Sequence, residues 1–215
     1  MSGPNLSNIV ALVPVRSLSG AKSRLGEPLD PEERADLILA LLRRTVESAL
    51  SARCLSGVVV VSMDPDLLQR ARAMGAASLE QATDGLNEGL GEARVAAGAE
   101  ATAVVVLPAD LPGITAPAID LLVEAAGIAL RDSPERPVVV LVPDRHGTGT
   151  NALLMSPPDA IEFRFGDRSR AAHAAAAKAR GASYVELEGP LTFDVDTPDD
   201  LLEADRRGLD HETGR

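Results

Sequence analysis

Four short runs of mostly β-branched apolar residues constrain the fold of this chain more than any other feature. They span residues 9–15, 58–61, 103–107 and 138–142, and each is followed by a turn signal. Strands that are buried on both faces of a parallel sheet have this continuous apolar character. Helical segments lie between the runs, so we predict an α/β fold with a mainly parallel, mixed sheet flanked by helices.

The predicted helices have clear start signals. A capping residue followed by proline at the first helical position occurs at Asp30-Pro31, Asp64-Pro65 and Thr197-Pro198. Glu33 completes a capping box with Asp30. Thr115 is expected to cap a helix over about 116–131, and the alanine-rich run 171–179 is typical of a helix.

No repeat or linker divides the 215 residues, so we predict one domain over residues 1–209 and a frayed polar tail over 210–215. Apolar residues make up 45% of the chain but aromatic residues only 2%. We therefore expect a core of alanine, valine and leucine. A nucleotide base would be recognised by backbone amides and small polar side chains rather than by aromatic stacking.

The formal net charge of −11 argues against nucleic acid as a partner, because phosphate contacts need clustered Lys and Arg. A small phosphorylated ligand is still compatible with this net negative charge, because one basic loop or a bound cation can make the local electrostatic potential positive. No apolar stretch approaches about 18 residues, and we expect a cytoplasmic protein without a membrane segment. The one cysteine, Cys54, is expected to end the first helix as a small buried hydrophobe without chemistry.

Ligands of an open parallel sheet bind beyond the carboxyl ends of its strands. Pro14 and Val15 end the first run, and a loop of small residues with Lys22 and Arg24 follows. Its amides could wrap phosphates, with Lys22 as a point charge and Arg24 as a planar fork. The loop has neither the P-loop spacing nor a dinucleotide fingerprint. A solvated basic loop is the alternative.

Three aspartates are candidate metal ligands. Asp110 follows the run 103–107 and is expected at the strand tip, between two prolines; ending a turn is its alternative role. Asp194 and Asp196 stand two residues apart on a predicted short strand, where both side chains face the same way. Carboxylate oxygens are the ligands that Mg²⁺ prefers.

Three further segments bear glycine or hydroxyl groups suited to anions. Asn87 could bind a base edge or cap the helix after it. Residues 144–151 alternate Gly and Thr after the fourth strand, with Arg145 as a candidate for the anionic substrate. Residues 163–170 bring three arginines and Ser169 to the start of a helix, where free amides favour an anion. Each segment alone could be an ordinary turn.

Taken together, phosphate-binding loops and carboxylates in one α/β domain match the requirements of in-line nucleotidyl transfer. A cation between carboxylates and phosphates neutralises the charge that develops on the α-phosphate. No protein nucleophile is evident, since His146 and His173 lack a Ser or Cys partner in the sequence. We expect both histidines to face solvent or to contact substrate.

The chain resembles the phospholactate/phosphoenolpyruvate guanylyltransferase family of coenzyme F-420 biosynthesis. The resemblance is carried, in order along nearly the whole chain, by residues 13–18, 21–25, 85–87, 108–112, 144–150, 165–166 and 194–198. The most specific part is Asp-Arg-His-Gly-Thr-Gly-Thr at 144–150. One departure is the Asp-Arg-Ser-Arg segment after Gly166, which is more cationic than the family pattern.

The resemblance implies a Rossmann-like nucleotidyltransferase fold, with GTP and Mg²⁺ as requirements and pyrophosphate as product. It implies that Thr150, Gly166 and Ser169 hold a phosphorylated three-carbon acid, and that Lys22 meets the triphosphate. The metal would be held by Asp110, Asp194 and Asp196. The downstream deazaflavin transferase is then a candidate partner for a direct hand-off of the product.

Several alternatives stay open on the sequence. The acceptor acid is phosphoenolpyruvate, 2-phospho-L-lactate or 3-phospho-D-glycerate. A related nucleotidyltransferase acting on molybdopterin or a sugar phosphate is a second hypothesis, and a non-catalytic nucleotide-binding regulatory module is a third. Hydride transfer is disfavoured, because no dinucleotide fingerprint follows the first strand.

Overall fold

The computed structural model of the chain describes residues 4–15, 30–195 and 198–206. Lys22, Arg24 and Asp196, which the sequence singles out as site residues, lie outside these ranges. The same holds for Thr197, the expected cap of the last helix, and for the tail over 210–215.

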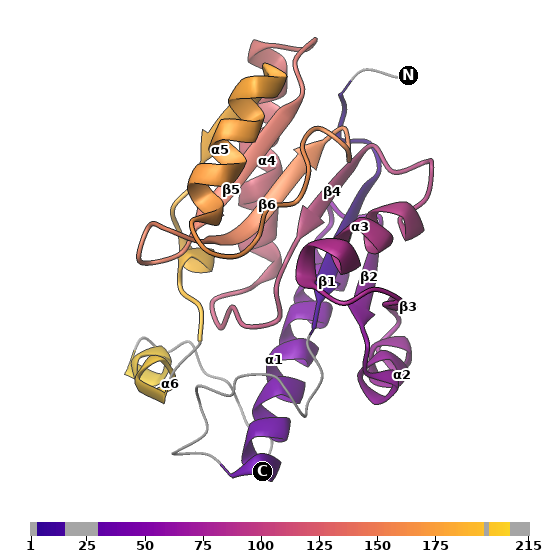
Figure 1. The fold of residues 1–215 in the computed structure, drawn as a ribbon, viewed down its shortest axis with the longest axis vertical. Coiled ribbons are helices and arrows are strands. Elements are labelled where there is room, and N and C mark those ends of the chain that lie inside the picture. Colours follow the sequence, from indigo (N-terminus) through magenta and orange to yellow (C-terminus); the bar gives the residue numbers. More distant parts are fainter. Residues whose placement is uncertain (1–3, 16–29, 196–197, 207–215) are drawn as a thin grey trace.

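One seven-stranded sheet organises the described residues (Figure 1). Its strands are β1 (Ile9–Pro14), β2 (Gly57–Ser62), β3 (Ala77–Glu80), β4 (Ala103–Val106), β5 (Val138–Pro143), β6 (Thr150–Ser156) and β7 (Ser183–Glu186). They lie in the order β3-β2-β1-β4-β6-β5-β7. Only the two pairings of β6, with β4 and β5, are antiparallel. The predicted mainly parallel mixed sheet is confirmed, and the four apolar runs are β1, β2, β4 and β5.

The helices begin largely where their caps predict. They are α1 (Pro31–Ser51), α2 (Pro65–Ala73), α3 (Leu86–Ala96), α4 (Ala116–Asp132), α5 (Ser169–Arg180) and α6 (Pro198–Arg206), with a short 3₁₀ turn, η2, at Pro190–Thr192. The Asp30 carboxylate accepts the amides of Glu32 and Glu33 at 2.8 and 2.9 Å, so the predicted capping box is confirmed. None of the described helices combines the length and apolarity that a membrane crossing needs.

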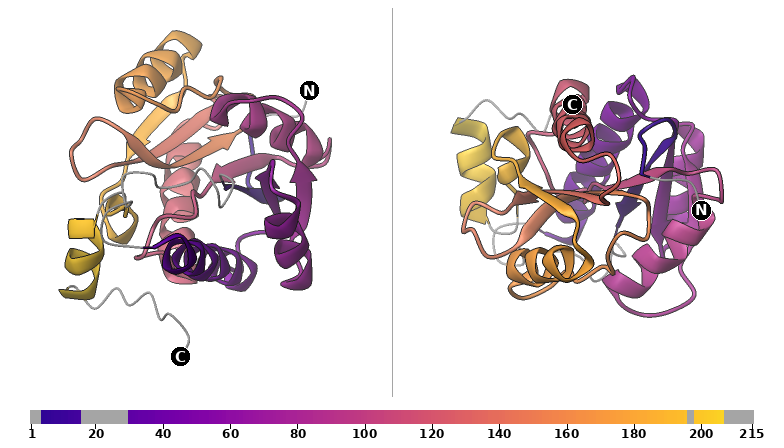
Figure 2. Two further views of the ribbon diagram at one scale, coloured as in Figure 1. Left: turned by 60° about the horizontal axis from the view of Figure 1, so that its bottom comes forward. Right: turned by 90° about the horizontal axis from the view of Figure 1, so that it is seen from above.

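Helices cover both faces of the sheet, as Figure 2 shows. Ile9, Ala11 and Val13 of β1 pack in one cluster with α1, α2 and α4. Val10 and Leu12, which point to the other face, pack with α3 and α5. Burial on both faces explains why the strands read as continuous apolar runs instead of alternating ones. The core is built mainly of Val, Leu and Ala, as the composition predicts.

Two local predictions differ from the structure. Residues 193–195 form no strand of the sheet and follow η2 as irregular chain. Phe193 and Val195 are nevertheless buried while Asp194 is only partly so, which preserves the predicted alternation of faces. Cys54 lies beyond the end of α1 and is half-buried against the core. Burial, aided by Asp120, raises the pKa of its thiol to about 12, in keeping with an inert residue.

Candidate active site

The carboxyl ends of β1 and β4 define the candidate site. β4 lies next to β1 on one side, whereas β2 and β3 lie on the other side of β1. Such a reversal of strand order is where open α/β sheets bind ligands. Pro14 ends β1, and the amide of Val15 donates to the Val61 carbonyl at 3.0 Å. The Val15 amide is therefore already used within the sheet.

The reversed direction of β6 adds a third segment to this edge. Val106 at the end of β4 pairs with Leu153, so the start of β6 extends past β4 on the carboxyl side. Thr150 and Asn151 begin β6 and are both nearly buried. The predicted anion-binding segment 144–151 thus forms the β5–β6 hairpin loop and the first residues of β6, beside Asp110.

Asp110 and Asp194 are brought together by backbone contacts. The Val195 amide donates to the Asp110 carbonyl at 3.0 Å. On the other side, the Asn151 side-chain nitrogen lies 3.0 and 2.9 Å from the carbonyls of Leu191 and Thr192 and 3.4 Å from Asp194 Oδ1. Asn151, which the sequence did not single out, therefore fastens the segment that carries Asp194 to the sheet.

Asp110 and Asp194 are candidate ligands for a hard divalent cation. Both aspartates are partly exposed, and carboxylate oxygens are suitable ligands for such an ion. Within the described ranges, no three His, Cys, Asp or Glu residues gather as a metal site. Asp196, the third predicted ligand, lies outside those ranges.

Gly113 packs closely against Pro190 of η2, the turn that precedes Asp194. A Cβ added at this buried glycine would lie 2.3 Å from the Pro190 carbonyl oxygen. Gly113→Ala should lower the free energy of unfolding by about 1–3 kcal/mol and reduce kcat, because η2 must move and Asp194 with it. Urea denaturation and initial rates measure both effects.

The matched control is Gly91→Ala in α3, where a Cβ meets nothing within 4 Å. It should leave activity unchanged and stabilise the helix slightly. If Gly113→Ala and the wild type had the same free energy of unfolding, η2 would be able to move away from the added Cβ without destabilising the fold, which would contradict the prediction.

His173 links Thr150 to the segment that precedes α5. It is fully buried, its Nδ1 lies 3.0 Å from Thr150 Oγ1, and its Nε2 lies 3.0 Å from the Arg164 amide. Burial, followed by the charge of Arg164, lowers the pKa of His173 to about 4. The expectation that His173 faces solvent or substrate is wrong, because β6 and residues 164–165 enclose the ring. His146 is exposed, as expected.

Asn87 contacts the same segment from α3. Its side chain donates to the Phe165 carbonyl at 2.9 Å and accepts the Phe165 amide at 2.8 Å. Gly85 caps α3, so Asn87 is not the cap. Asn87 therefore fixes the backbone next to Gly166, and its binding of a base edge stays a prediction.

Gly166 and Ser169 complete the cluster of predicted acceptor residues. Gly166 is exposed and has a φ of +126°, a conformation that side chains disfavour. Its carbonyl accepts the Ser169 amide at 3.2 Å, and Ser169 begins α5 with only 2% of its surface exposed. Gly166 and Ser169 thus lie at the start of α5, the helix whose His173 contacts Thr150.

Two arginines of the predicted site make structural contacts. Arg145 forms an ion pair with buried Asp200 of α6, and its guanidinium carbon lies 5.0 Å from the centre of the Phe193 ring. Arg170 binds Glu186 and donates to the Gly147 carbonyl at 3.0 Å. Arg145 thus connects the β5–β6 loop to α6, and Glu186 offsets part of the unusual positive charge near Ser169.

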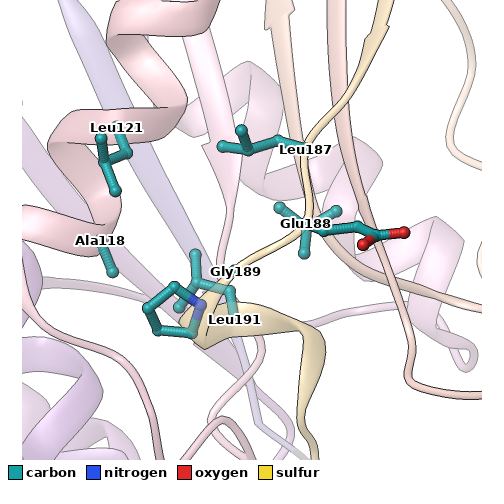
Figure 3. A pocket seen from close by; sticks show the side chains of 8 residues that line it. Ala118, Leu121, Leu187, Glu188, Gly189 and Leu191 are labelled. Atoms are coloured by element: carbon teal, nitrogen blue, oxygen red, sulfur yellow. The ribbon is translucent and has the colours of Figure 1, made fainter.

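A small depression lies between α4 and residues 187–191 (Figure 3). Leu121 and Leu187 face it from opposite walls, and Glu188 is its one charged lining residue. Figure 3 shows the Glu188 carboxylate pointing away from the α4 wall, so the lining is almost wholly apolar and does not suit a phosphorylated ligand. The carboxyl edge of β1, β4 and the start of β6 remains the candidate site.

Comparison with known proteins identifies the family. Residues 9–214 match the family described as "Guanylyl transferase CofC like". The chain belongs to this family of guanylyl transferases. It is 46% identical over 203 residues to a phosphoenolpyruvate guanylyltransferase of Rubrobacter xylanophilus, covering 94% of this chain and 95% of that protein. A relative with the same name from Sphaerobacter thermophilus is 48% identical over 198 residues, covering 90% and 91%.

Solved structures place the guanylyl transferase fold among the nucleotidyltransferases. A nucleotidyl transferase from Methanothermobacter superimposes with a TM-score of 0.64 at 16% identity, over 94% of this chain and 98% of that one. A 4-diphosphocytidyl-2C-methyl-D-erythritol synthase from Anaerococcus prevotii gives 0.63 at 10% identity, over 94% and 96%. The predicted fold and the predicted enzyme class, a nucleotidyltransferase, are both confirmed. Enzymes of this class generally use a divalent metal ion.

Proposed function

We propose that this guanylyl transferase moves GMP from GTP onto the phosphate of phosphoenolpyruvate and releases pyrophosphate, with Mg²⁺, in coenzyme F-420 biosynthesis. The observation that carries the proposal is the meeting, at one edge of the sheet, of the Asp110–Asp194 pair with the Thr150, Gly166 and Ser169 cluster. The names of the relatives at 46% and 48% identity support phosphoenolpyruvate over the other two acids.

The two halves of this edge suit different parts of the reaction. Asp110 and Asp194, with Asp196, would hold the magnesium ion. When bound there, the ion would supply positive charge to offset the negative charge that develops on the α-phosphate. Pro14 and Val15 at the end of β1 are proposed to begin the nucleotide side, and Lys22 and Arg24 are proposed to hold the triphosphate.

The acceptor side needs donors and no general base. A phosphate oxygen of the acid is already anionic at neutral pH, so it attacks the α-phosphate without losing a proton first. The hydroxyls of Thr150 and Ser169 and the backbone at Gly166 are proposed to hold the anionic groups of the acid. Precise placement accelerates such a transfer, because the reacting oxygens must lie in line.

Pyrophosphate release from GTP and Mg²⁺ tests the proposal, with phosphoenolpyruvate, 2-phospho-L-lactate and 3-phospho-D-glycerate supplied separately. The downstream transferase and its deazaflavin acceptor should be present, so that the guanylated product is consumed. We expect the highest kcat/KM with phosphoenolpyruvate. A preference for another acid would reassign the acceptor, and silence with all three would contradict the proposal.

Ser169→Ala tests the acceptor side. The variant should raise the KM of the acid about tenfold or more, the usual cost of losing a hydrogen bond to a charged group. The KM of GTP should change less than twofold. Steady-state kinetics with each substrate varied in turn measures both values. Equal effects on the two substrates would place the acid elsewhere.

A further inference from the structure

The hydrogen bonds around His173 determine which ring nitrogen carries the proton. The Arg164 backbone N–H can only donate, and it lies 3.0 Å from Nε2. Nε2 must therefore be an unprotonated acceptor. In a neutral imidazole the proton then resides on Nδ1. Nδ1–H consequently donates to Thr150 Oγ1, 3.0 Å away.

The neighbouring contacts make this arrangement rigid. Asn87 holds the Phe165 backbone through both its amide and its carbonyl. The Phe165 ring meets His173 edge-on, with ring centres 5.0 Å apart and an angle of 71° between the planes. The Arg164 amide, one residue before Phe165, thus has little freedom to turn away from Nε2.

The direction of this hydrogen bond decides what Thr150 can offer to a ligand. Because Oγ1 accepts from His173, its own hydroxyl hydrogen is not used in that contact. Within the described part of the chain, no other side-chain hydrogen bond of Thr150 is formed. With the opposite tautomer, Thr150 would donate to His173 and present lone pairs, which repel an anion.

We propose that His173 is a positioning residue that makes the Thr150 hydroxyl a donor toward an anionic oxygen of the acceptor acid. This inference rests on the proposed function, since it assumes that the acid binds at Thr150. The site would then favour groups that only accept hydrogen bonds, such as an ionised phosphate or carboxylate. His173 itself, buried behind Thr150, does not touch the substrate.

Nitrogen-15 NMR of the histidine side chains tests the tautomer directly, with His173→Asn used to assign the signals. We expect a pyrrole-type shift for Nδ1 and a pyridine-type shift for Nε2 at neutral pH. A protonated Nε2 would overturn the inference whatever the substrate is.

A double-mutant cycle tests the role. His173→Leu and Thr150→Val should each raise the KM of phosphoenolpyruvate about 10- to 100-fold, with a much smaller change in the KM of GTP. The double variant should be little worse than Thr150→Val alone, because His173 acts through that hydroxyl. His173→Asn, which can place an N–H near the Nδ1 position, should recover part of the loss.

The outcomes separate the two proposals. A wild-type enzyme that turns over none of the three acids would contradict the proposed function. Turnover by the wild type with fully additive effects in the cycle would leave the proposed function intact and overturn the role of His173, because a purely structural residue would weaken binding independently of Thr150.

Discussion

Asp110→Asn is expected to lower kcat about 10²- to 10³-fold, the usual cost of removing one fixed electrostatic contact from a transition state. The amide has the shape of the carboxylate but lacks its charge, so the affinity for Mg²⁺ should fall as well. The fold should persist, since the contact with the Val195 amide uses the Asp110 backbone carbonyl. Rates measured across a Mg²⁺ titration, with circular dichroism as a check on folding, give the result.

Asp159→Asn is the matched control. Asp159 is exposed in the turn after β6, at the opposite edge of the sheet from Asp110. This variant makes the same chemical change and should retain wild-type rates. An Asp110→Asn enzyme with full activity at ordinary Mg²⁺ concentrations would exclude Asp110 as a metal ligand.

The free energy of unfolding should decrease as the pH falls from about 6.5 toward about 4. The pKa of His173 is lowered from 6.5 to about 4 by burial and by Arg164, so the unfolded chain binds a proton in this interval before the folded chain does. The contribution is fully present above pH 6.5 and is lost as the pH falls through this range. Its full size is on the order of 3 kcal/mol.

Urea denaturation at a series of pH values measures this dependence, with His173→Asn as the comparison. The interval from pH 5 to 6.5 is the informative one. Below it, the carboxyls of Glu186 and Glu92 also titrate; their pKa values are lowered chiefly by the hydrogen bonds with Arg170 and the Ala82 amide, respectively. The variant should lose much of the slope between pH 5 and 6.5. An unchanged slope would mean that His173 does not remain neutral in the folded state.

Local sequence predicted the elements of the fold well. The β-branched runs became β1, β2, β4 and β5, and the capping residues Asp30, Asp64 and Thr115 begin α1, α2 and α4. These signals are short-range, because a cap satisfies amides two or three residues away and a buried strand needs only its own apolar side chains. Family membership also followed from short motifs spread along the chain.

Tertiary structure decided how the site residues meet. Thr150 reaches the carboxyl edge because β6 runs against its neighbours, which the apolar pattern of 150–156 does not reveal. His173 bonds Thr150 across 23 positions, and Asn87 bonds Phe165 across 78. The sequence therefore assigned a solvent or substrate role to His173 and a base or capping role to Asn87.

The sequence by itself determined that this chain forms a mainly parallel α/β sheet, that Asp110 follows a central strand, and that its motifs are those of a guanylyl transferase. Only the tertiary structure decided that the segment carrying Asp194 contacts Asp110 in space and that Arg145 pairs with Asp200. It also decided that His173 is buried with its Nδ1 toward Thr150. The physical reason is that such contacts depend on strand order and direction. These are set by the packing of the whole core, and no local periodicity encodes them.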